Sequence, residues 1–202
     1  MTDPMLPRFG RRVDVRPFFA ADRRGLTELL PTLTDNDWQA STAAGPWRVR
    51  DVVAHIIGDD VARLARTRDG HPGPGPTPGE ALASFLHRHN AEWVAAHQRV
   101  SVRTLLDLLE VTTSQILKMW YDLDLGGVGE QVSWVADEPA PIWLDCGRDF
   151  TEYWIHQQQI RDAVGRPRHL IRSSPMRSWT SCSGRCPAPC GTSPRRQAPA
   201  SR

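Results

Sequence analysis

Apolar residues recur every three or four positions through most of this chain, and this spacing constrains the fold more than any other feature. The clearest stripes are Leu26, Leu29, Leu30 and Leu33 in one segment, and Leu105, Leu106, Leu109, Ile116 and Met119 in another. A period near 3.6 residues places such positions on one face of an α-helix. Short strand-like segments are few, so the spacing predicts an all-α protein.

Turn and cap residues divide this pattern into helices. The predicted helical segments are 20–33, 49–66, 80–98, 101–122 and 142–164. Ser101 suits the N-cap of one helix, and Gly165 followed by Pro167 ends the last. A stretch of alternating Pro and Gly, residues 71–79, favours neither helix nor strand. We expect an up-down bundle of four main helices, one of them split.

Length and charge exclude several classes of protein. The 202 residues are enough for a domain with a real core, and the net charge of +2 is small. Because many basic residues lie near the two ends, they predict no nucleic-acid face. No stretch approaches the roughly 18 apolar residues of a membrane span, and residues 1–15 lack the apolar region of a signal peptide. The expectation is a cytoplasmic monomer or homodimer.

The composition divides the chain into three parts. We expect a flexible N-terminal arm over residues 1–19, a metal-binding helical bundle over 20–167 and a disordered tail over 168–202. The tail is rich in Ser, Pro, Arg and Cys, and its Cys182, Cys186 and Cys190 lack the CxxC pairs typical of metal sites. Read one base out of frame in GC-rich codons, residues 177–187 give an amphipathic helix. We therefore hypothesise that the tail is a frameshift product.

Two segments carry candidate metal ligands. Glu152 and His156 are four residues apart, so on a helix they share one face. His55 lies among aliphatic residues in a different predicted helix. Two imidazoles and one carboxylate from two packed helices could hold a divalent metal and leave one coordination position open, which is typical of catalytic sites.

Other interpretations of these residues stay open. Glu152 and His156 could belong to a solvated polar face, and His55 could be a hydrogen-bonded core histidine, since burying an unpartnered imidazole is costly. Asp59, one turn after His55, could be a further ligand or could accept a hydrogen bond from a ligand. We expect the remaining histidines to lie on the surface: His71, His87, His89, His97 and His169.

Two motifs give the chain a family resemblance. WRVRDVVAH at 47–55 and TEYWIHQQQIRDAVGRP at 151–167 resemble the mycothiol-dependent maleylpyruvate isomerase family of the DinB/YfiT-like superfamily, over roughly residues 20–167. The resemblance implies a helical bundle that holds a divalent metal, usually zinc, through His55, Glu152 and His156. Better-studied members carry a C-terminal α/β domain that supplies an arginine, and this chain changes character where that domain would begin. The family motif often has Asp at the position of Gln159.

The resemblance also implies a chemistry. A metal-bound, mycothiol-like thiol would add to an electrophilic small molecule, as in an isomerase or S-transferase, because a coordinated thiol is deprotonated. Arg148, Gln159 and Arg161 are candidates for binding the thiol cofactor or orienting the ligands, although Arg161 could instead cap its helix. The sequence assigns no catalytic residue. The alternatives are a metal-dependent hydrolase that activates water, and a non-catalytic metal- or thiol-binding bundle or truncated fragment.

Overall fold

The computed structural model describes residues 9–131 and 139–170, and nearly all of these are helical or in short connections. The long helices are α2 (Arg16–Leu29), α4 (Val49–Arg63), α5 (Leu82–Ala96), α6 (Val102–Asp122) and α7 (Ile142–Ala163). The short elements are α3 (Asp35–Trp38), the single-turn helices Leu30–Thr32 and His97–Arg99, a π-helical extension of α4 (Leu64–Arg68), and an antiparallel pair, β1 (Val128–Gln131) and β2 (Pro139–Pro141).

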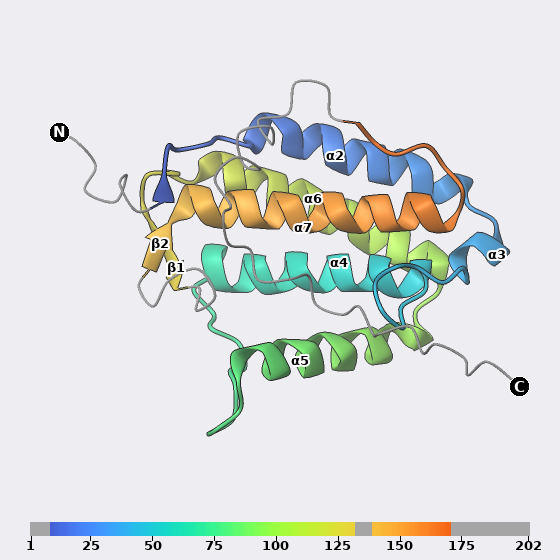
Figure 1. Ribbon diagram of the computed structural model, residues 1–202, viewed down its shortest axis with the longest axis horizontal. Helices are drawn as coiled ribbons and strands as arrows, with labels where there is room; N and C mark the ends of the chain where they lie inside the picture. The colour runs from blue at the N-terminus through green and yellow to red at the C-terminus, as the bar shows by residue number, and fades with distance from the viewer. Residues whose placement is uncertain (1–8, 132–138, 171–202) are drawn as a thin grey trace, which may run out of the picture.

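Four of the long helices form a closed bundle. Helix α2 packs against α6 and α7, and α4 packs against the same two helices from the opposite side. Consecutive long helices alternate in direction, with α5 lying outside the bundle against α4 (Figure 1). Because α5 returns the chain to its starting end, α4 and α6 run parallel, and Arg50 on α4 donates to the carbonyl of Val100 just before α6, 3.0 Å away. The all-α four-helix prediction is confirmed.

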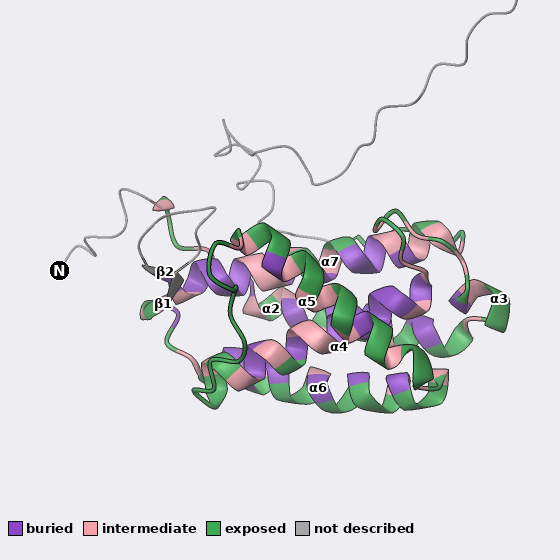
Figure 2. Cartoon of the chain, turned by 90° about the horizontal axis from the view of Figure 1, so that it is seen from below, coloured by how far each residue is buried: buried purple, intermediate pink, exposed green. Residues whose placement is uncertain are grey.

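The core lies where the four helices face one another. Buried residues line the inner helix faces, and exposed residues cover the outer faces of α5 and α6 (Figure 2). At one end Phe19 contacts three other aromatic rings, those of Trp120, Phe150 and Tyr153, with centroids 5.6–6.3 Å apart. Large aromatic side chains contribute most to such a core because each buries a large apolar area. Within the described part of the chain, no helix has both the length and the apolar character needed to cross a membrane.

A tryptophan of α5 makes a close contact with α4. The indole of Trp93 donates to the carbonyl oxygen of Ala54, 2.8 Å away. A Cβ at Gly58 would lie only 2.7 Å from the Trp93 ring, so glycine allows the close approach of the two helices.

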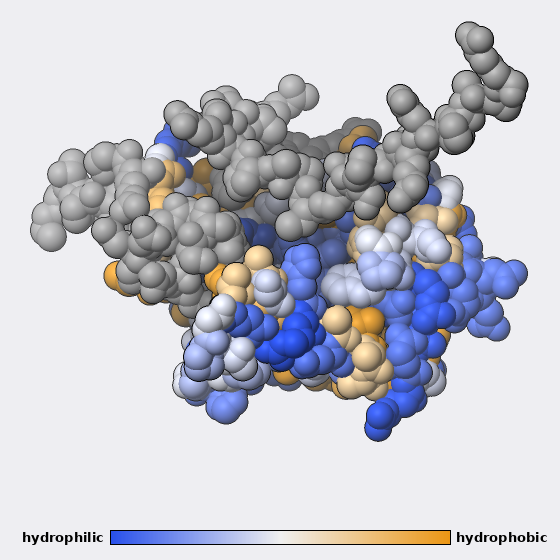
Figure 3. Space-filling view, turned by 60° about the horizontal axis from the view of Figure 1, so that its bottom comes forward, coloured by the Kyte–Doolittle hydropathy of each residue, from blue (hydrophilic) through white to orange (hydrophobic). Residues whose placement is uncertain are grey.

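The face of the molecule seen in Figure 3 is mostly hydrophilic where described residues cover it, with smaller apolar patches between the polar side chains.

The ends of the bundle differ from the prediction. The N-terminal arm was expected to reach residue 19, but α2 begins at Arg16, and Val15 and Phe19 are buried. Pro17 suits the first turn of a helix because its φ is already helical, and Phe19 anchors that turn in the core. Residues 1–8 lie outside the described part.

The C-terminal boundary also lies later than expected. Arg168 pairs with Asp162 at 2.9 Å, and the His169 amide donates to Gln158 Oε1 at 2.9 Å. His169 was expected on the surface, but it is half-buried. Its ring packs so closely on Gly25 that a Cβ at that position would clash with it. Residues 168 and 169 are therefore attached to α7. The disordered, frameshifted tail was predicted over residues 168–202, and its residues 171–202, with all three tail cysteines, lie outside the described residues. Residues 132–138 of the predicted loop lie outside them as well.

A buried carboxyl group joins α2 to α7. The Gln157 side-chain amide donates to the backbone carbonyl of Asp22 at 2.7 Å and to its Oδ1 at 3.0 Å. Asp22 is only 2% exposed. Burial raises the pKa of Asp22 to about 7, although the charges of Arg23 and Arg161 oppose that rise. The folded protein therefore holds a proton here that the unfolded chain releases near pH 4.

We predict that Asp22→Asn changes how stability depends on pH. Because the folded pKa lies above the unfolded one, Asp22 stabilises the fold below about pH 4, and this contribution is lost as the pH rises to about 7. Asparagine keeps the Oδ1 acceptor and does not titrate. Between pH 4.5 and 7.5, urea unfolding should show the variant gaining about 2–4 kcal/mol relative to the native chain. Parallel pH profiles for the two proteins would contradict the assignment.

Candidate metal centre

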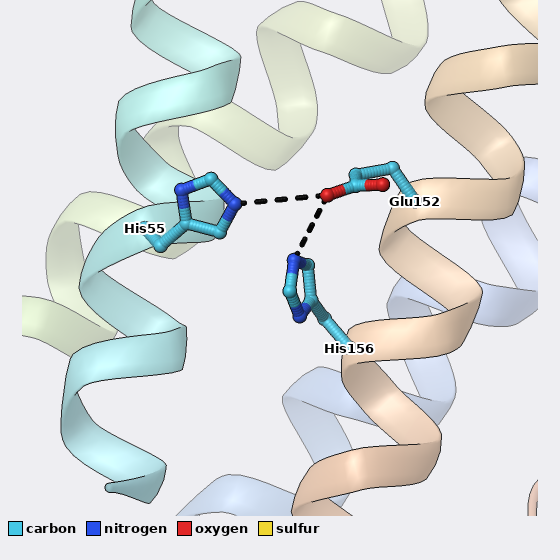
Figure 4. A group of neighbouring side chains, drawn as sticks. All are labelled: His55, Glu152 and His156. Atoms are coloured by element: carbon cyan, nitrogen blue, oxygen red, sulfur yellow. Dashed lines mark hydrogen bonds and ion pairs between the residues drawn. The ribbon is translucent and has the colours of Figure 1, made fainter. Parts of the chain in front are cut away.

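Two helices that pack antiparallel carry the candidate ligands. Helix α4 begins after Arg48, where the Asp51 carboxylate accepts from the Arg48 backbone amide at 3.0 Å and so caps the first turn. Helix α7 begins after Pro141, with Asp145 in its first turn, where a negative charge is favoured. Two turns into α4, His55 faces α7, and Glu152 and His156 of α7 face it in return (Figure 4).

The three side chains converge on one point. Glu152 Oε1 lies 3.0 Å from His156 Nε2 and 3.8 Å from His55 Nε2. The ligand atoms all lie within 4.8 Å of one another, and the two imidazole rings meet edge to face with centroids 4.8 Å apart. Among the residues that the structure describes, no other set of three His, Cys, Asp or Glu side chains converges in this way.

The cluster is buried on one side and open on the other. The side chains of His55 and His156 are 5% and 8% exposed, whereas that of Glu152 is 52% exposed. His156 therefore does not belong to a solvated polar face. A core histidine needs only to be buried and to have a hydrogen-bond partner, and both imidazoles meet that requirement. Metal binding needs more, namely three donor atoms that converge beside solvent, and this cluster has that property as well.

The charges within the cluster are strongly coupled. Hydrogen bonds from His156 and then from His55 lower the pKa of Glu152 well below its usual range. Burial opposes a charge on His156, but the hydrogen bond and negative charge of Glu152 outweigh it and raise the pKa of His156. Without a metal, the carboxylate and an imidazolium therefore stabilise each other. A metal ion would take the place of that proton.

Three neighbouring side chains contact the ligand set. The Gln159 carbonyl oxygen lies 2.8 Å from His156 Nδ1, so it accepts that N–H and leaves Nε2 facing the cluster. Asp59 Oδ2 lies 3.3 Å from His55 Nε2, and burial raises the pKa of Asp59 to about 6. The Trp47 ring lies against the His55 ring, with centroids 4.7 Å apart. The sequence indicated Gln159 and Asp59, but no local pattern indicated Trp47.

The two predicted arginines lie elsewhere on α7. Arg148 is bonded to Asp145 at 3.1 Å, one turn before Glu152. Arg161 donates to the carbonyl oxygens of Gly25 at 2.8 Å and Pro167 at 3.3 Å. These bonds direct Arg161 toward α2 and the C-terminal segment, so it does not join the metal-ligand cluster. These contacts favour the alternative role for Arg161 given by the sequence, which is to stabilise the end of its own helix.

Sequence reasoning missed two buried ion pairs that link α4 to its neighbouring helices. Arg23 of α2 pairs with Asp60 of α4, and both side chains are almost completely buried. Arg63 of α4 pairs with Asp149 of α7 through two bonds of 2.8 Å. The signal in the sequence was Asp60 and Arg63 among the buried residues of α4. That pattern does not reveal which helix carries the partner.

The donor set suits a divalent metal. Tetrahedral zinc with bonds of about 2.0–2.1 Å requires ligand atoms about 3.4 Å apart. The distances to Glu152 Oε1 of 3.0 and 3.8 Å are close to that value, and the two imidazole nitrogens lie within 4.8 Å of each other, so a small inward movement of the imidazoles would complete the set. Two histidines and one glutamate with an open fourth position are the protein ligands of known catalytic zinc sites. His55, Glu152 and His156 would hold the ion, and Asp59 would lie beside it.

The fold and the cluster together define a helical-bundle domain with a two-histidine, one-carboxylate centre. The family model described as the mycothiol maleylpyruvate isomerase N-terminal domain matches residues 19–161, and the chain belongs to this family. It is thus a mycothiol-related domain of a metal-binding family with a DinB-like fold.

The structural comparison supports the fold independently. A solved structure titled "Sibling Lethal Factor Precursor - DfsB" superposes with a TM-score of 0.58 at 17% identity, covering 76% of this chain and 95% of that chain. At that level of identity the likeness shows the shared fold alone. A search of curated proteins finds no match.

We predict that the purified chain binds about one zinc ion, as expected for a single His₂Glu centre. His55→Ala and His156→Ala should each abolish this binding, since two protein ligands hold zinc weakly. His87→Ala on the exposed face of α5 is the matched control and should keep the metal. Elemental mass spectrometry after zinc reconstitution and desalting measures the content. A folded native chain without zinc, or a His156→Ala variant that retains it, would refute the centre.

A second prediction concerns Gln159, which orients His156. Gln159→Leu keeps the size of the side chain but removes the acceptor, so zinc affinity should fall about 10- to 100-fold. Gln159→Glu keeps an acceptor at the same position and should bind zinc at least as tightly as the native chain. Competition with a chromophoric chelator measures both affinities. Equal affinity for the two variants would show that this hydrogen bond does not support the ligand.

Proposed function

We propose that this domain is a divalent-metal-dependent thiol enzyme. In this proposal it activates a low-molecular-weight, mycothiol-like thiol for addition to an electrophilic small molecule, as an isomerase or S-transferase. One observation carries the proposal: His55, Glu152 and His156 converge beside solvent, with Glu152 on the open side. Membership of the mycothiol-related family supports the choice of a thiol as the reacting partner.

Zinc is the metal we propose for this site. Two imidazole nitrogens and one carboxylate oxygen are donors that zinc accepts, and three protein ligands leave room for one exogenous ligand. When bound, the ion would supply Lewis acidity that lowers the pKa of a thiol in the open position.

The chain's own residues would prepare that position. Gln159 accepts from His156 Nδ1 and so holds Nε2 toward the cluster. The buried His55 side chain and the partly buried Trp47 ring against it exclude water from one side, while the exposed side of Glu152 leaves an approach for the thiol. Arg148, half-buried on the same helix, is our candidate for binding an anionic group of the thiol or of the electrophile.

The overall reaction follows from this arrangement. The sulfur of the thiolate forms a bond to one carbon of a carbon–carbon double bond that is conjugated to a carbonyl group. The π bond breaks, and its electron pair moves onto the conjugated carbonyl group, so the former double bond becomes a single bond. In an S-transferase the proton lost by the thiol ends on the product, which keeps the carbon–sulfur bond. In an isomerase that bond breaks again after rotation about the neighbouring carbon–carbon bond, and the thiol is released unchanged.

We predict thiol-dependent loss of an electrophile such as maleylpyruvate when the zinc-loaded chain is mixed with mycothiol. His156→Ala should lower the rate at least 100-fold, because it removes a ligand of the activating ion. His87→Ala should keep the native rate. Chromatography with mass detection separates an isomer from an S-conjugate. Consumption without thiol would indicate the hydrolytic alternative, and zinc binding without turnover would indicate a non-catalytic bundle.

A further inference from the structure

A second contact joins the two helices that carry the ligands. Arg63 of α4 donates through Nε and Nη2 to the two carboxylate oxygens of Asp149 on α7, and both bonds are 2.8 Å long. The Arg63 side chain is 4% exposed and that of Asp149 is 13% exposed. A two-bond pair between planar groups accepts a narrow range of geometries, so it defines where the two helices lie relative to each other.

This pair and the ligand cluster require the same register of the helices. Eight residues separate His55 from Arg63 on α4, and seven separate Asp149 from His156 on α7. At 1.5 Å per residue these intervals are about 12 and 10.5 Å along antiparallel axes. One alignment of α4 against α7 therefore brings both pairs together. A shift of one turn, about 5.4 Å, would separate both.

The neighbouring buried pair differs in the helices that it joins. Arg23 and Asp60 link α2 to α4, and their side chains are 1% and 0% exposed. Breaking that pair removes a buried interaction of the same chemical kind. Arg23 also lies over the ring of Tyr153 on α7, 3.8 Å from its centroid. Removing Arg23 leaves both bonds between Arg63 and Asp149 in place, so it separates a general loss of stability from loss of the contact that sets the register.

We propose that Arg63 and Asp149 are positioning residues of the metal centre, which hold α4 and α7 in the register that brings His55 to Glu152 and His156. This inference rests on the proposed function only in requiring that the cluster binds a metal. Arg63 lies eight residues, about two turns, from His55 along α4. The effect of the pair therefore passes through the helices, and it should govern metal affinity and ligand geometry.

The test measures metal binding by the full chain under conditions in which each variant is folded by circular dichroism. Arg63→Met and Asp149→Asn should each weaken zinc binding about tenfold or more and change the visible absorption of the cobalt-substituted protein. Arg63→Lys keeps the charge without the planar fork and should recover part of the affinity. Arg23→Met, the matched control, should lower stability yet keep the zinc affinity within about twofold and leave the cobalt spectrum unchanged.

Each outcome decides the inference. If Arg63→Met does not fold, Asp149→Asn, which preserves shape and removes one charge, gives the same comparison. Native-like zinc affinity and an unchanged cobalt spectrum in folded Asp149→Asn would overturn the proposal, as would an equal loss of affinity in Arg23→Met. A native chain that binds no zinc would overturn it as well. Tight zinc binding without thiol turnover would refute the enzyme function alone and leave the positioning role standing.

Discussion

The antiparallel packing of α4 against α7 is the contact on which the candidate centre depends. Helix α4 supplies one imidazole and α7 supplies a carboxylate and a second imidazole, so neither helix has three ligands by itself. Apolar burial brings the helices together but is non-directional and tolerates small shifts. The bonds between Arg63 and Asp149 are directional, and they select one alignment of these two helices. Hydrophobic packing and buried polar bonds therefore have separate roles here.

The buried charges are better explained by geometry than by stability. Taking two ions out of water costs about as much as their attraction returns, so a well-packed apolar pair is often as stable. Arg23 and Asp60, like Arg63 and Asp149, nevertheless lie inside the bundle and link α4 to α2 and α7 respectively. Removing one partner would leave an uncompensated buried charge. Such pairs penalise alternative helix arrangements more strongly than an apolar interface would.

The cluster combines buried ligands with an exposed one, and this combination would suit a reactive site. The two imidazoles are buried and held by Gln159, Trp47 and Asp59, whereas Glu152 faces solvent. Rigid ligands on one side and access on the other are what an exogenous thiol would require. The solved structure compared above is only 17% identical, so function has to be argued from these residues and not from the architecture.

The sequence by itself determined the local features: the periodic helices, the Ser101 cap, and the pairing of Glu152 with His156 across one helical turn. With the family motifs it also indicated His55. Tertiary structure decided the start of α2 at Arg16, the direction of Arg161 toward α2, and the contacts of Trp47 and Asp149. The physical reason is range: caps and i,i+4 pairs depend on neighbouring residues, whereas contacts between helices depend on the register and angle at which whole faces pack.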